Sequence, residues 1–173
     1  MSKRVSLREF QESLAHRLKA AAGEPASSAR LSFEAGNSRW LLRLESSGEL
    51  LPVPRIDRVP LARDWFLGVA NVRGMLFGVT DFSAFLGGAP TARAGDNRLL
   101  LIGEPLGVNA ALLVTRLTGL RNLSELEPAE NDGSHAGAQW TERTWRDREG
   151  RAWHELDAAK LLSHRDFLDV AAP

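Results

Sequence analysis

The sequence predicts a mainly β protein with a helix at its start. From Leu31 onward, short apolar runs are separated by Gly, Asn, Asp and Ser, a pattern typical of strands joined by tight turns. Two of these strands are each followed by an Asp and a short helical pattern. A chain of 173 residues with 43% hydrophobic and 25% charged residues fits one domain, or two small subdomains that share a core.

The first segment has the pattern of an amphipathic helix. Ser6 and Glu9 have the spacing of a capping box. We predict a helix over residues 1–22 and a linker over residues 23–30, which is rich in Gly, Pro, Ala and Ser. The apolar positions recur at helical spacing, at Val5, Leu7, Phe10, Leu14 and Leu18.

The rest of the chain is predicted to be strands with two short helices. The helices are expected after Asp81 and after Asp157, because each carboxylate can accept the unpaired N–H groups of a first helical turn. The predicted strands are Leu31–Glu34, Trp40–Leu44, Glu49–Val53, Val69–Val72, Met75–Thr80, Leu99–Ile102, Asn109–Val114, Gln139–Arg146 and Ala152–Glu155.

An internal repeat relates the two halves of this β region. Gly74–Leu86 aligns with Gly150–Leu162, with the same interval from Gly to Asp, and a segment that contains Phe or Leu follows each Asp. A turn, a strand, an Asp cap and a short helix therefore occur twice. This repetition predicts two related β-subdomains.

Composition and charge argue against several classes of function. Lys plus Arg (22) equals Asp plus Glu (22), and the densest Arg run, over residues 143–151, alternates with acidic residues, so a nucleic-acid partner is not expected. The absence of Cys removes disulfides and thiolate metal sites, and is compatible with a reducing cytoplasm. Neither a signal-peptide pattern nor an apolar run near the roughly 20 residues of a membrane span is found. We expect a cytoplasmic protein without direct membrane insertion.

Motifs for catalysis, metal binding or cofactor binding are lacking. The four His residues lack metal-site spacing, and no nucleophile elbow, P-loop or dinucleotide fingerprint occurs, so no catalytic residue, metal or cofactor is predicted. One alternative stays open: a small β-barrel hydrolase or ligand-binding protein that uses Asp81, His154 and Asp157. That alternative requires the three side chains to converge in a deep pocket, whereas helix capping already accounts for both carboxylates.

The aromatic residues divide into two groups. Trp40, Trp140, Trp145 and Trp153 lie in predicted strands, where such large rings are usually buried. Trp65 instead stands with Phe66 just before Gly68, and is expected at a rim or at a subdomain junction.

The segment Gly68–Gly74 (GVANVRG) is the candidate contact surface. Asn71 and Gly74 suit a tight reversal, which would place Arg73 at its apex beside apolar strands. The residues alone support two interpretations equally, a solvated surface hairpin and an Arg anchor at a protein interface.

The stretch from Trp65 to Asp81 resembles the hallmark of CheW-like adaptor domains, G-x-x-N-x-R-G followed by a strand that ends in Asp. The resemblance covers roughly residues 31–162. It departs from the family pattern at Gly78, where Pro is frequent, and at Thr115, where Asp is usual. The N-terminal pattern, GVANVRG and the ending Phe167–Val170 most resemble adaptors of type IV pilus (twitching motility) chemosensory systems.

The resemblance implies two intertwined, five-stranded, SH3-like barrels around a joint core, over residues 31–165, with a tail at 166–173. It implies a non-enzymatic scaffold that links the cytoplasmic tip of a methyl-accepting chemoreceptor to the regulatory domain of a CheA-type histidine kinase, in membrane-associated arrays. The predicted protein interface comprises Trp65, Phe66, Asn71, Arg73 and Gly74. Whether the N-terminal helix docks on its own barrel or binds a partner is left open, as is the partner preference of the second half.

Overall fold

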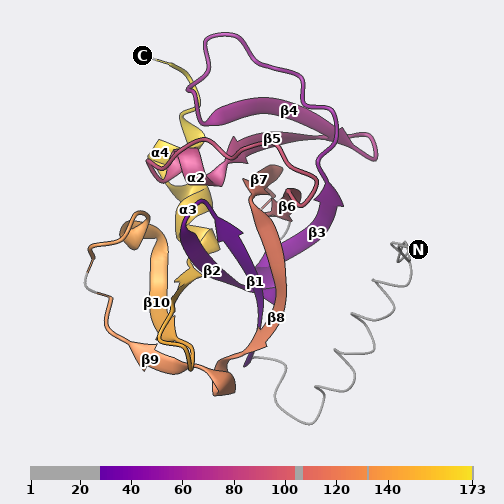
Figure 1. Cartoon of the computed structure of the whole chain (residues 1–173). Coiled ribbons are helices and arrows are strands. Elements are labelled where there is room, and N and C mark those ends of the chain that lie inside the picture. The colour runs from indigo at the N-terminus through magenta and orange to yellow at the C-terminus, as the bar shows by residue number, and fades with distance from the viewer. Residues whose placement is uncertain (1–27, 104–106, 132, 173) are drawn as a thin grey trace.

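The computed structural model describes residues 28–103, 107–131 and 133–172. Within them the chain forms two β-sheets with short helices at their junction (Figure 1). The predicted helix over residues 1–22, and nearly all of the predicted linker, lie outside the described residues. In the described part of the chain no helix has the length and apolar character to cross a membrane.

The two sheets, called barrel A and barrel B, share one plan. Barrel A has the strand order β8 (Arg116–Asn122), β1 (Ala29–Ala35), β2 (Ser38–Arg43), β11 (Ala152–Leu156), β10 (Thr141–Arg146), β9 (Glu127–Ala129). Barrel B has the order β3 (Ser47–Pro52), β6 (Arg98–Ile102), β7 (Ala110–Val114), β5 (Met75–Asp81), β4 (Phe66–Val72). The helices are α2 (Phe82–Phe85), α3 (Ala158–Ser163) and α4 (Arg165–Leu168), with 3₁₀ turns η3 (Leu44–Ser46), η5 (Leu123–Glu125) and η6 (Ala138–Trp140).

The internal repeat is present in both barrels. An antiparallel hairpin, β1–β2 or β6–β7, pairs in parallel with the strand that precedes a capped helix, β11 or β5. The two predicted caps are confirmed: Asp81 accepts a hydrogen bond from the N–H of Ala84, and Asp157 accepts one from the N–H of Lys160. The mainly β, two-barrel prediction is thus confirmed, but barrel A has six strands and not the expected five, because the short β9 pairs with β10.

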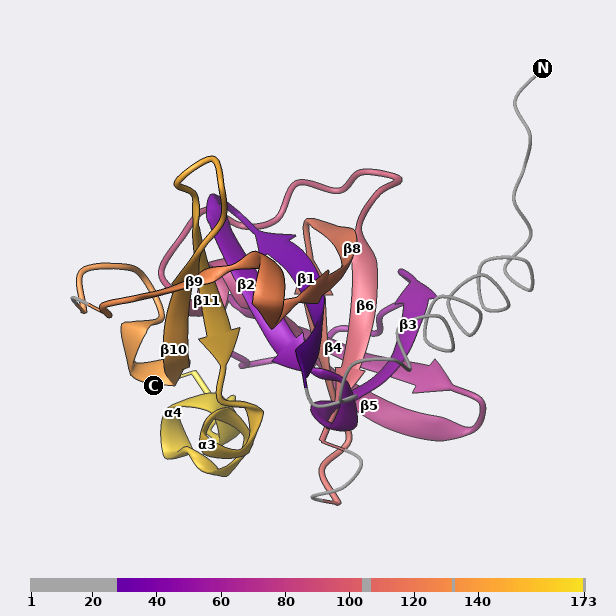
Figure 2. The same cartoon turned by 90° about the horizontal axis from the view of Figure 1, so that it is seen from below.

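The barrels are intertwined because the chain changes sheet after the β1–β2 and β6–β7 hairpins. It leaves barrel A after β2 to form β3 in barrel B, and it returns after β7 to form β8 in barrel A. Figure 2 shows β1 and β2 in the centre, with β9, β10 and β11 on one side and β3 and β6 on the other. Neither barrel can therefore form from a single half of the sequence.

Each barrel is closed by the segment that follows its edge strand. After β8, η5 leads to β9, which pairs with β10 at the opposite edge of barrel A. After β3, Asp57 pairs with Val69 of β4 through reciprocal backbone hydrogen bonds of 2.8 and 2.9 Å. The repeat therefore extends to the way in which the barrels close.

Apolar strands in the centre of the molecule serve two cores at once. Leu99 and Leu101 of β6 point into barrel B, whereas Leu100 and Ile102 belong to the joint core between the barrels. Successive side chains of a strand point to opposite faces, so a strand buried on both faces has a continuous apolar run. The joint core also holds Phe33, Trp40, Phe82, Leu112, Trp140, Leu161 and Phe167.

Several elements were not predicted from the sequence. The strand β8 contains Gly119 and several polar residues, and its side chains are half-buried or exposed, so it lacks an apolar run. The strand β9 is three residues long and contains Pro128. The predicted tail at 166–173 includes most of α4, whose Phe167 is buried, and Ala171 pairs with Ala62.

Barrel A encloses a buried ion pair next to an apolar cluster of Leu41, Leu126, Trp145 and Trp153. Glu155 is 1% exposed, and its Oε1 lies 2.6 Å from Nε of Arg30, which is also buried. Its other carboxylate oxygen accepts a 3.2 Å hydrogen bond from Nε1 of Trp145. Barrel B is lined instead by apolar side chains such as Val72, Phe77 and Val79.

The turn between β10 and β11 is organised by Asp147. Its carboxylate accepts hydrogen bonds from Nε1 of Trp153 (3.0 Å), from Nε of Arg151 (2.8 Å) and from the backbone N–H groups of Glu149 and Arg151. Burial acts to raise the pKa of Asp147, but the hydrogen bonds from Trp153 and Arg151 outweigh it and lower the pKa from 3.8 to about 2.

This lowered pKa predicts an acid-dependent stability. Because the ionised form is favoured in the folded chain, the contribution of Asp147 is complete above about pH 4 and is lost as the pH falls towards 2. Asp147→Asn should lower the free energy of unfolding by roughly 2 kcal/mol near neutral pH, and the difference should vanish near pH 2. Urea denaturation of both proteins across this range measures it; a difference that does not change with pH would contradict the assignment.

Candidate functional site: the β4–β5 hairpin

The hallmark residues form a two-residue turn between β4 and β5. Arg73 and Gly74 both have positive φ, 53° and 87°, which is the pattern of a type I′ turn. The Oδ1 of Asn71 accepts a 2.8 Å hydrogen bond from the N–H of Gly74. Asn71 and Gly74 therefore act within the turn, and together they present Arg73 at its apex.

Arg73 is the exposed cation of this hairpin. Its side chain is 74% exposed, and its Nη2 lies 2.6 Å from Oε1 of Glu49 on β3. A left-handed backbone costs a residue other than Gly roughly 1–2 kcal/mol. An exposed ion pair recovers only about 0–1 kcal/mol. Arg73 thus occupies a position where folding alone would favour Gly.

Two exposed apolar side chains lie next to this cation. Met75 is 54% exposed and Leu76 is 59% exposed. In Figure 1 the turn between β4 and β5 projects from the side of barrel B. The candidate contact surface therefore combines Arg73, Met75 and Leu76; the two apolar residues were not among the predicted site residues, although they follow the hallmark directly.

Gly68, the first glycine of the hallmark, is required by the closure of barrel B. Its φ is +127°, and a Cβ atom built on it would lie 2.1 Å from the backbone oxygen of Asp57. Asp57 pairs with Val69, so any side chain at position 68 would push the closing segment away. This part of the hallmark maintains the fold.

Trp65 and Phe66 lie at the other end of β4, not at the turn. Trp65 is half-buried and packs edge-on against Phe85 of α2, with ring centroids 5.1 Å apart, and stacks on Phe167 of α4 at 6.5 Å. The seven residues of β4 separate the two ends by roughly 20 Å. The five predicted interface residues therefore form two groups, and only Asn71, Arg73 and Gly74 share the hairpin turn.

The residues of the enzymatic alternative have separate structural contacts. Asp81 is buried and accepts hydrogen bonds from the N–H of Ala84 and from both the N–H and the hydroxyl of Thr91. Asp157 caps α3. The ring of His154 stacks on that of His135, with centroids 3.6 Å apart. Among the residues that the structure describes, His, Asp and Glu side chains form no group suited to a metal ion.

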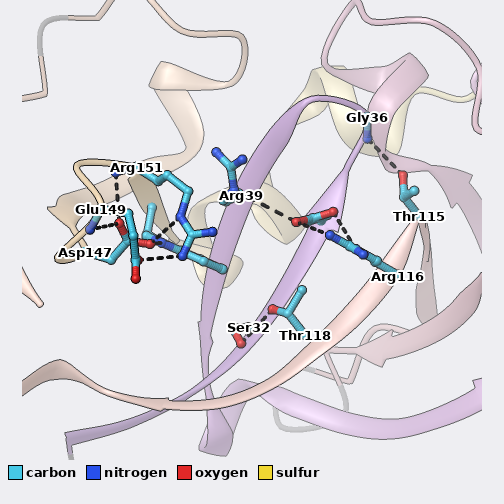
Figure 3. A network of polar contacts seen from close by, with 11 residues as sticks. Ser32, Gly36, Arg39, Thr115, Arg116, Thr118, Asp147, Glu149 and Arg151 are labelled. Atoms are coloured by element: carbon cyan, nitrogen blue, oxygen red, sulfur yellow. Dashed lines mark hydrogen bonds and ion pairs between the residues drawn. The ribbon is translucent and has the colours of Figure 1, made fainter. Parts of the chain in front are cut away.

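Gly78 and Thr115, the two residues that depart from the family pattern, each make a hydrogen bond within the fold. The N–H of Gly78 donates a 3.0 Å hydrogen bond to the oxygen of Asn109, which a Pro could not do. The hydroxyl oxygen of Thr115 accepts a 3.0 Å hydrogen bond from the N–H of Gly36 (Figure 3). Thr115 thereby joins the β1–β2 turn to the crossing between barrels.

A family model for the CheW-like domain matches residues 30–166, which is most of the chain. The chain belongs to the CheW-like domain family. Among curated proteins, this CheW-like chain is 31% identical to "Protein PilI" of Pseudomonas aeruginosa (strain PAO1) over 147 residues, which cover 82% of this chain and 79% of that protein.

The fold of the CheW-like chain is also that of a solved structure. The crystal structure of the scaffolding protein TtCheW from Thermoanaerobacter tengcongensis superposes with a TM-score of 0.70, covering 83% of this chain and 92% of TtCheW. The two sequences are 16% identical, so this likeness concerns the fold. It confirms the two-barrel architecture expected from the hallmark.

Proposed function

We propose that this CheW-like protein is a non-enzymatic scaffold that couples a methyl-accepting chemoreceptor to a CheA-type histidine kinase. Family membership and the likeness to PilI support this role and, within it, the control of type IV pili and twitching motility. The receptor would be bound at its cytoplasmic tip and the kinase at its regulatory domain, so the adaptor would be cytoplasmic and recruited to receptor arrays.

The observation that carries the proposal is the β4–β5 hairpin. Its turn holds a largely exposed Arg73 in a backbone conformation that a Gly would adopt at lower cost, beside exposed Met75 and Leu76. Arg beside apolar side chains is typical of the centres of protein interfaces. Each contact of such a scaffold is expected to bury about 1,200 Å² or less and to gain strength from multivalent assembly.

A pull-down with the regulatory domain of the cognate kinase tests this function. The full chain should retain the kinase domain, and so should a variant that lacks residues 1–22 if the barrels alone make the contact. Absence of binding with both proteins would refute the scaffold role. If only the shortened protein fails, the first 22 residues supply the contact to the kinase.

A further inference from the structure

Four arginines surround a cavity at the mouth of barrel A. The cavity has a volume of about 350 Å³ and is lined by Arg39 of β2, Arg116 and Arg121 of β8, Arg151, Glu34 and Trp153. Among these lining residues Glu34 is the sole carboxylate, so the wall is predominantly cationic. The chain as a whole has a formal net charge of zero, which makes this a local concentration.

The strand register gathers these charges. Glu34 of β1 pairs across the sheet with Arg39 on one side and with Arg116 on the other. Figure 3 shows Arg39 and Arg116 reaching towards the same carboxylate. The fork of Arg116 binds Glu34 through two hydrogen bonds of 2.7 and 3.0 Å, and this pairing lowers the pKa of Glu34.

Two of the guanidinium groups keep their donors available. The Nε of Arg39 is 3.9 Å from Glu34, beyond hydrogen-bond distance, and the guanidinium of Arg121 lies over the Trp153 ring, 4.2 Å from its centroid. Within residues 28–103, 107–131 and 133–172, neither side chain donates a hydrogen bond to the protein. Arg151, by contrast, is held by Asp147 and Glu149.

The fold does not require this charged lining. Barrel B has the same strand plan and an apolar interior. Buried and half-buried charges generally contribute little net stability compared with apolar side chains of similar size. The mouth of a small barrel with a few convergent polar groups is a common place for a binding site, and guanidinium forks match the two oxygens of a carboxylate.

We propose that the mouth of barrel A binds an acidic segment of a protein partner, whose carboxylates are held by Arg39 and Arg121. Arg116 and Arg121 extend the cationic surface along β8 for roughly 17 Å, longer than one small anion and suited to a row of acidic side chains. The strand β8 also ends the order of its sheet, so a peptide has a backbone edge to follow. This surface is separate from the β4–β5 hairpin of barrel B and goes beyond the function proposed above.

NMR titration of the full chain tests the site. The probes are an N-acetylated, C-amidated (Glu-Ser)₃ peptide, the matched (Gln-Ser)₃ peptide and inorganic phosphate. The acidic peptide should shift the Nε–Hε signals of Arg39 and Arg121 to saturation, and the Gln peptide should not. Absence of saturation with the acidic peptide would overturn the proposal, and so would phosphate binding as tightly as the peptide, because a small-anion site would then suffice.

Variants assign the effect to these residues. The double variant Arg39→Gln, Arg121→Gln should weaken peptide binding at least about tenfold, whereas Arg39→Lys, Arg121→Lys, which keeps the charge and loses the fork, should weaken it less. Arg93→Gln, an exposed control, should leave it within about twofold. Glu34→Gln should strengthen it, because it removes the competing carboxylate and releases Arg116.

An equal loss with Arg93→Gln would show non-specific charge attraction, and no gain with Glu34→Gln would show that Glu34 does not compete with the peptide for Arg116. Either result would overturn the site. Thermal unfolding checks that each variant is folded. If the acidic peptide does not bind, the outcome of the kinase pull-down is unaffected, so the two proposals are tested separately.

Discussion

Replacing Glu155 by Gln is expected to lower the free energy of unfolding by about 3–5 kcal/mol, because it leaves the guanidinium of Arg30 buried without its carboxylate. The two side chains are 2.6 Å apart inside barrel A, and Nε of Arg43 lies 3.6 Å from the same carboxylate. The amide of Gln can still accept a hydrogen bond from Trp145, so the loss reports mainly on the charge. Urea denaturation at neutral pH measures the effect.

The matched control is Glu149→Gln, which removes an exposed carboxylate that pairs with Arg151 at 2.7 Å. It should cost at most about 1 kcal/mol. In addition, the double variant Arg30→Met, Glu155→Gln should be more stable than the two single changes would give by addition, since it removes both charges. Equal losses for Glu155→Gln and Glu149→Gln would mean that the interior pair is screened like a surface pair.

Reversing the charge of Arg73 is expected to weaken binding to the kinase regulatory domain or to the receptor tip by at least about tenfold, or roughly 1.4 kcal/mol. The fold should be retained, because Arg73 is 74% exposed and its ion pair with Glu49 is a surface pair. Binding is measured by titration calorimetry, and the stability of Arg73→Glu by thermal unfolding.

The matched control for Arg73→Glu is Arg148→Glu, the same charge change on the β10–β11 turn of barrel A, where Arg148 is exposed. Arg73→Gly is the second variant: it keeps the positive φ at low cost and removes the guanidinium. Its free energy of unfolding should match that of the parent to within about 1 kcal/mol. Its affinity for the kinase domain or the receptor tip should be lower. If Arg73→Glu binds with unchanged affinity, Arg73 has no role in the interface and is only a solvated side chain of a surface hairpin.

Local signals in the sequence predicted much of the fold. The strands with apolar runs, the Asp caps before α2 and α3, and the tight turn at Asn71–Gly74 all depend on residues near one another in the chain. The burial of Trp40, Trp140, Trp145 and Trp153 was likewise expected from their places in predicted strands, although Trp140 in fact lies in η6, just before β10. The strand β8 and the segment β9 were missed because edge segments pair through their backbones and need no apolar side chains.

The candidate contact surface was predicted only in part. Its turn could be predicted from Asn71 and Gly74, because the hydrogen bond between them joins residues that are close in the chain. The separation of Trp65 and Phe66 from Arg73 is a consequence of the extended length of β4, and the packing of Trp65 against Phe167 joins residues a hundred positions apart. The exposure of Met75 and Leu76 depends on what the rest of the fold leaves uncovered.

Local patterns in the chain were sufficient to identify two repeated β-units with a family hallmark on the first of them. The folded structure was needed to show that the units exchange strands, that Leu99 and Leu100 belong to different cores, and that Arg39, Arg116, Arg121 and Arg151 surround one cavity. The difference lies in the range of the interactions. Turns and caps are hydrogen-bonded within a few residues, whereas strand pairing and core packing join distant segments, which acquire their neighbours only when the whole chain folds.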